Sequence, residues 1–167
     1  MAGHFGFSYV GLMYLLMLFI PNVFWAAHQP AGYERIKDKE KKIPVLLERA
    51  GQVGVTACAL VFTDFNLAPF SAWSVWLIVS FGCMLLYEVC WIRYFTGKHT
   101  LKDFYGPFLG IPLPLAVLPV AAFLLLGVYG KVGWMMLFAV LLGIGHIGIH
   151  ANHHKEALRM ASTPEEE

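Results

Sequence analysis

The sequence predicts an all-α membrane protein, a bundle of five transmembrane helices. Of its 167 residues, 58% are hydrophobic and only 14% are charged, and the mean hydropathy is +0.62. Soluble globular domains are about 45–50% apolar and about 25% charged, so this composition argues strongly against a water-soluble or disordered chain. The apolar residues form long runs without the period of two that is typical of membrane barrel strands. A formal net charge of +1 gives no indication of nucleic-acid binding.

Each run supplies the roughly 20 apolar residues that a spanning helix needs. The first run ends in the aromatic pair Phe24–Trp25, which is typical of a membrane interface. No Lys or Arg precedes Arg35, so this run lacks the positive region of a signal peptide and is predicted to be a retained span. In the fourth run, Pro112 and Pro114 are expected at the helix start and Pro119 at a kink. The predicted spans are about residues 5–27, 45–65, 72–95, 110–128 and 132–152.

Basic residues predict the orientation. Short cytoplasmic loops are enriched in Lys and Arg, and eleven of the twelve basic residues lie on one side of the predicted spans, with only Lys131 on the other. The N-terminus is therefore expected outside and the C-terminus in the cytoplasm, in the plasma (inner) membrane if the source is bacterial. A single domain, residues 1–160, precedes a flexible polar tail, residues 161–167. The eleven residues are Arg35, Lys37, Lys39, Lys41, Lys42, Arg49, Arg93, Lys98, Lys102, Lys155 and Arg159.

The main candidate site is a histidine cluster in the last span. Ionisable side chains at membrane depth are costly and are functional candidates by default. At about 100° per helical residue, His146, His150, His153 and His154 fall within about 100° of arc. Gly143 lies on the same face, and small residues mark close contact between membrane helices. This face is therefore expected to point into the bundle, although His153 and His154 also fit interfacial side chains near lipid headgroups.

A carboxylate is expected to complete the site. His146 and His150 have the i, i+4 spacing with which one helix offers two imidazoles to one metal ion, Zn or Fe, which would need a third ligand. Glu88 lies at the same expected depth, about 9–10 Å below the cytoplasmic interface, and is predicted as that ligand. Without a metal, Glu88 and His146 also fit a buried hydrogen-bonded pair. The other candidate residues are His153 and His154 as weaker metal ligands, and Asn22, His28, Glu48 and Arg93 as part of a transport or proton site.

Other polar residues have plainer interpretations. Glu48 also fits a local pair with Arg49 at the interface, with the acidic side chain near a helix N-terminus. Asp64 is predicted to lie in a turn that ends the second span. The three cysteines all fall within predicted spans and form no CxxC motif, so they are predicted to be packing residues.

Three functions are compatible with these residues. The first is transport of a small solute or cation, or proton-coupled transport, by a homo-oligomer, because five helices enclose little volume and histidine changes its charge near neutral pH. The alternative is a metal-dependent enzyme that acts on a lipidic substrate at the cytoplasmic interface. The third is a non-catalytic membrane partner subunit. The sequence contains no nucleotide-binding or haem-attachment motif.

Overall fold

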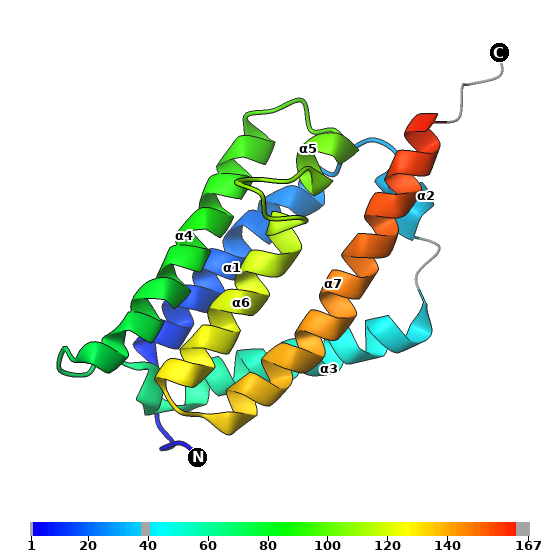
Figure 1. Cartoon of the computed structure of the whole chain (residues 1–167). Coiled ribbons are helices and arrows are strands. Elements are labelled where there is room, and N and C mark those ends of the chain that lie inside the picture. The colour runs from blue at the N-terminus through cyan, green and yellow to red at the C-terminus, as the bar shows by residue number, and fades with distance from the viewer. Residues whose placement is uncertain (1, 38–40, 163–167) are drawn as a thin grey trace.

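The computed structural model describes residues 2–37 and 41–162 (Figure 1), and the secondary structure of these residues is helical apart from two isolated bridges. Four helical segments are long and apolar enough to cross a membrane, by length and composition: α1, α3, η2 with α4, and α7. The all-α prediction is therefore confirmed. The elements in chain order are α1 (Tyr9–Ala27), α2 (Tyr33–Lys37), α3 (Lys42–Val61), the 3-10 turns η1 (Thr63–Phe65) and η2 (Ala72–Ser74), α4 (Val75–Phe95), α5 (Leu101–Tyr105), α6 (Pro114–Tyr129) and α7 (Gly133–Ser162).

Several helix boundaries differ from the predicted ones for identifiable reasons. Helix α1 begins only at Tyr9, because the Ser8 hydroxyl caps it by accepting a hydrogen bond from the Gly11 N–H at 2.9 Å. Helix α6 begins at Pro114, because the left-handed backbone of Leu113 (φ +49°) interrupts the helix. Pro119 lies inside α6, as predicted, whereas Pro112 lies in the preceding loop. With 16 residues, α6 is a shorter apolar helix than the four candidate spans.

Helix α7 is longer than predicted. It continues past residue 152 to Ser162 and so carries all four clustered histidines. Residues 161 and 162 therefore belong to the helix, and the rest of the predicted tail lies outside the described residues. Helices α2 and α5 are short helices that were expected to be loops, and η1 is the turn predicted around Asp64.

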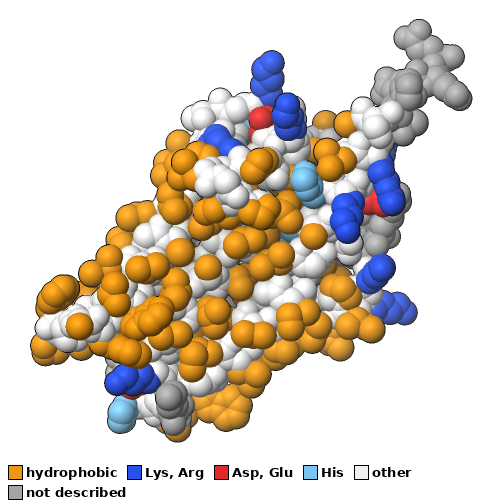
Figure 2. All heavy atoms as spheres, viewed as in Figure 1, with side chains coloured by type: hydrophobic (Ala, Val, Ile, Leu, Met, Phe, Trp, Pro, Cys, Tyr) orange, Lys and Arg blue, Asp and Glu red, His pale blue; other side chains and the backbone are white. Residues whose placement is uncertain are grey.

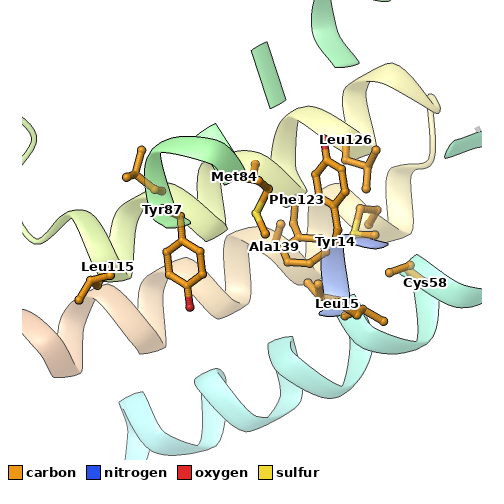
Figure 3. Close-up of a cluster of buried hydrophobic side chains, with 14 of the residues drawn as sticks. Tyr14, Leu15, Cys58, Met84, Tyr87, Leu115, Phe123, Leu126 and Ala139 are labelled. Carbon is orange, nitrogen blue, oxygen red and sulfur yellow. The ribbon is translucent and has the colours of Figure 1, made fainter. Parts of the chain in front are cut away.

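The long helices surround one aromatic and aliphatic core. Helix α6 packs between α4 and α7, and α3 packs along α7. Buried side chains from α1, α3, α4, α6 and α7 converge in this core (Figure 3). A short chain of hydrogen bonds lies inside it: the hydroxyls of Tyr14 and Ser80 are 2.9 Å apart, and Ser80 donates to the Ala122 carbonyl at 2.7 Å.

Glycines allow α3 and α7 to approach backbone to backbone. A Cβ atom on Gly51 would lie 2.3 Å from the backbone nitrogen of Leu142 in α7. A Cβ on Gly145 would lie 2.3 Å from the backbone nitrogen of Glu48 in α3. Real Cβ atoms do not come this close to backbone, so both positions require glycine for this packing. The approach places the first turns of α3 beside the middle of α7.

Helices α1 and α3 are in contact at the end of the bundle where α1 begins. Gly11 faces the carbonyl of Ala59, and the rings of Phe5 and Phe62 stack with centroids 5.1 Å apart. Asn66 accepts a hydrogen bond from the Tyr9 N–H at 2.9 Å. From there the two helices diverge (Figure 1).

Charged side chains are concentrated at the ends of the molecule. In Figure 2 the body of the visible face is largely apolar, and most of the Lys and Arg side chains lie toward the end where α7 finishes. We call this the basic end. Exposed apolar residues such as Val23 and Ile92 lie on the outside of α1 and α4. An apolar exterior between polar ends is what a lipid environment requires.

Candidate functional site

A central cavity of about 190 Å³ lies in the half of the bundle nearer to the basic end. All five long helices and α5 contribute to its wall. Most of the wall is apolar, with Phe104, Pro119 and Phe123 among its residues. The polar and ionisable side chains in the wall are Asn22, Glu48, Gln52, Tyr87, His146 and His150.

The centre of the site is a pair formed by Glu48 and His146. The Glu48 Oε1 and His146 Nδ1 atoms are 2.5 Å apart, and each side chain is about one-quarter exposed (25% and 24%). The close approach at Gly145 brings the Glu48 backbone beside α7 and so permits this contact. One proton lies between the two atoms, donated either by the imidazole to a carboxylate or by the carboxylic acid to a neutral imidazole.

His150 extends the pair along α7. Its ring centroid lies 4.4 Å from that of His146, one helical turn away. On its other side it lies 5.9 Å from the rings of Phe104 and of Tyr105 in α5. A proton held between Glu48 and His146 therefore has a second imidazole beside it. Aromatic rings pack against the far side of this imidazole.

The opposite wall carries a polar pair of its own. The Asn22 amide donates to the Tyr87 hydroxyl at 2.7 Å and to the Leu18 carbonyl at 2.7 Å. The Asn22–Tyr87 pair therefore joins α1 to α4, and the Glu48–His146 pair joins α3 to α7.

The cavity reaches the molecular surface between α1 and α3. Phe19 on α1 and Gln52 on α3 line the cavity and are also exposed. Both residues lie on the stretch along which α1 and α3 diverge (Figure 1). In a membrane, this opening would face lipid rather than bulk water.

Glu88 does not belong to this cavity, contrary to the sequence-based expectation. It lines a separate groove between α1 and α4, together with His28. Helix α6 packs between α4, which carries Glu88, and α7, which carries His146. The carboxylate that meets His146 is Glu48, whose expected local partner Arg49 is exposed. The signal in the sequence was the pair of glycines, Gly51 and Gly145, that lets α3 approach α7.

The remaining predicted site residues lie outside the central cavity. Arg93 holds the loop after α5, because its Nη1 donates to the Pro107 carbonyl and its Nη2 to the Gly106 carbonyl, both at 3.0 Å. His153 is buried, with its ring 5.8 Å from that of Tyr33 in α2. The His154 ring lies 6.0 Å from that of Tyr105. The last turns of α7 thus use their histidines to pack against the short helices.

The predicted metal site is not supported. Within residues 2–37 and 41–162, no group of three or more His, Cys, Asp or Glu side chains is arranged to hold a metal ion. The predicted ligands His146, His150 and Glu88 are divided between the cavity and the groove. The Glu48–His146 distance of 2.5 Å is that of a hydrogen bond, whereas two ligands of one tetrahedral Zn would stand about 3.4 Å apart.

No protein-family model, curated protein or solved structure matches this chain. The class of protein is therefore defined by the fold and the site. The chain is a helical bundle with apolar helices long enough to cross a membrane, consistent with an integral membrane protein, and its central cavity contains a hydrogen-bonded Glu–His pair.

Proposed function

We propose that the chain crosses the membrane five times, with the N-terminus outside and the basic end in the cytoplasm. Helix α6, the fourth span in chain order, is added to the four longer helices: its 16 residues cover about 24 Å, somewhat less than a 30 Å hydrocarbon core. Helix α1 begins at the end of the bundle opposite to that where α7 finishes (Figure 1), as an odd number of crossings requires. The excess of Lys and Arg at the basic end supports the orientation.

Within that topology, the protein transports a small solute or cation in exchange for protons through the central cavity. The observation that carries this proposal is the Glu48–His146 pair inside a cavity to which every long helix contributes. The pair shares a proton, and His150 stands beside it as a second acceptor. A cation entering the cavity would compete with that proton for the carboxylate. Intramembrane Asp, Glu and His side chains commonly serve proton relays for this reason.

The hydrogen-bonded geometry favours proton exchange over metal-dependent catalysis. A direct Glu48–His146 contact leaves no space for an ion between those two atoms, and Glu88 lines the groove between α1 and α4 instead. Formation of a homo-oligomer, or association with a partner subunit, stays a prediction.

Proton flux in proteoliposomes tests the proposal. Vesicles containing the purified chain and a trapped pH-sensitive dye are diluted into Na⁺, K⁺, Mg²⁺ or methylammonium salts. At least one cation is expected to change the luminal pH with the wild-type chain and to have no effect with Glu48→Gln. The matched control is Glu34→Gln, on the exposed face of α2, which is expected to behave like wild type. Equal proton flux in wild type and Glu48→Gln would contradict the role of the pair, and a lack of response to all four cations would contradict the coupling.

A further inference from the structure

A second site lies outside the central cavity, in a groove of about 370 Å³ between α1 and α4 near the basic end. Trp91 and Pro21 are buried and form its floor, and Ile20, Phe24 and Ile92 form an exposed apolar rim. The groove faces outward, so in a membrane its contents would be reached from the lipid. The other lining residues are His28, Glu88, Phe95 and His99.

Glu88 is an acid without a partner in this groove. Its Oε1 atom is buried and, in the part of the chain that the structure describes, has no hydrogen-bond partner. A buried carboxylate is costly unless a cation or a hydrogen-bond donor neutralises it. Arg93, five residues further along α4, is held by loop carbonyls instead. The groove thus contains a carboxyl oxygen that no described side chain satisfies.

Two histidines in the groove lining, His28 and His99, offer further hydrogen-bond acceptors. His28 Nδ1 lies 2.8 Å from the Phe24 carbonyl, and His99 Nε2 lies 3.2 Å from the Phe95 carbonyl. A carbonyl only accepts, so each of these ring nitrogens carries a hydrogen and donates it. In the neutral imidazole the other nitrogen then has a lone pair and no hydrogen. The groove therefore combines one carboxylate and two imidazole acceptors with aromatic rings.

We propose that this groove binds the ammonium group of a primary alkylamine, with the alkyl chain on the apolar rim. The Glu88 carboxylate accepts N–H hydrogen bonds from an alkylammonium, and the aromatic rings of Trp91 and Phe24 attract a cation. An anion would meet the Glu88 carboxylate, and a neutral alcohol would leave its charge uncompensated. The site is independent of the transport proposal, because it shares no ionisable side chain with the central cavity.

Calorimetric titration of the purified full-length chain in detergent tests the site, with octylammonium as the probe. Wild type is expected to bind it saturably and in a one-to-one ratio. Octyltrimethylammonium, which has no N–H, is expected to bind about tenfold more weakly or worse, and octanoate is expected not to bind. Glu88→Gln is expected to lose at least about thirtyfold in affinity, and the matched variant Glu34→Gln, on the exposed face of α2, is expected to lose none. Equal octylammonium affinity in wild type and Glu88→Gln would overturn the proposal.

A second variant covers the case in which Glu88→Gln does not fold. Phe24 is 60% exposed, so Phe24→Leu removes an aromatic ring from the rim without touching the core. About a threefold loss of octylammonium affinity supports the site, and an unchanged affinity overturns it. The same chemistry is offered by a soluble amine and by the headgroup of an aminophospholipid. Displacement of octylammonium in nanodiscs containing phosphatidylethanolamine, but not in those of phosphatidylcholine alone, identifies the lipid as the source, and binding in both identifies a soluble amine.

Discussion

The four clustered histidines of α7 have different surroundings although they share one helix face. His146 meets a carboxylate, His150 lies between His146 and aromatic rings, and His153 and His154 pack against tyrosines of α2 and α5. The sequence predicted the shared face correctly from the helical period. It could not predict the partners, because those come from helices α2, α3 and α5, which are remote in the sequence.

The Glu48–His146 contact is expected to show a measurable coupling energy. In a double-mutant cycle of Glu48→Leu and His146→Leu, thermal unfolding should give an interaction of about 1.5–3 kcal/mol, typical of a hydrogen bond to a charged group. The matched cycle of Glu48→Leu with His154→Leu should give less than about 0.5 kcal/mol, because His154 does not line the cavity. Equal coupling in both cycles would show that the contact is not specific.

At the scale of single helices, close packing of α3 on α7 positions the candidate site. Gly145→Ala should lower the free energy of unfolding by about 1–3 kcal/mol, because its Cβ would press on the Glu48 backbone. Gly148→Ala on the same helix is the control. A Cβ there meets nothing within 4 Å, and alanine favours the helix, so stability should be unchanged or rise by up to about 1 kcal/mol. Thermal unfolding in detergent measures the stability of both variants. Similar losses of stability in Gly145→Ala and Gly148→Ala would contradict a specific packing role for Gly145.

The short helix α5 is expected to respond to acid. Hydrogen bonds from the backbone and side chain of Thr100 are the main cause that lowers the pKa of Asp103 below its usual value. Because the pKa is lower in the folded state, Asp103 stabilises α5 above the unfolded value of about 3.9, and this contribution is lost as the pH falls below it. Hydrogen exchange of residues 101–105, corrected for intrinsic rates, should therefore accelerate between pH 5 and pH 3. Asp103→Asn should exchange faster already at pH 5 and change little with pH.

For the whole molecule, composition and periodicity predicted the helical class and the approximate positions of the long helices. The boundaries that failed depend on local geometry: the left-handed Leu113 delays α6, and α7 continues because its last turns pack on α2 and α5. The sequence also named most of the ionisable residues that line the two sites. Glu88 lines the groove rather than the central cavity, and the packing of α6 between α4 and α7 that separates it from His146 is not encoded in the helical period.

The proposed topology predicts which cysteines can be labelled from outside. With the native cysteines replaced, a single cysteine at Lys131 should react with a membrane-impermeant maleimide in intact cells. A single cysteine at Lys98 should react only after the membrane is opened. The reverse pattern would show that the orientation is opposite to the proposed one. Labelling of both cysteines from outside would contradict an odd number of spans.

Helices α1 and α3 approach closely at Gly11 and Ala59, and residues further along both helices line the central cavity. Glu48 lies eleven residues from Ala59, about 16 Å along α3. At this distance, a change of one degree in the crossing angle would displace Glu48 by about 0.3 Å. A tilt of ten degrees would move the carboxylate by about 3 Å, roughly the width of a water molecule. A small change in the angle at which α1 and α3 cross would therefore produce an ångström-scale displacement of the Glu48 carboxylate.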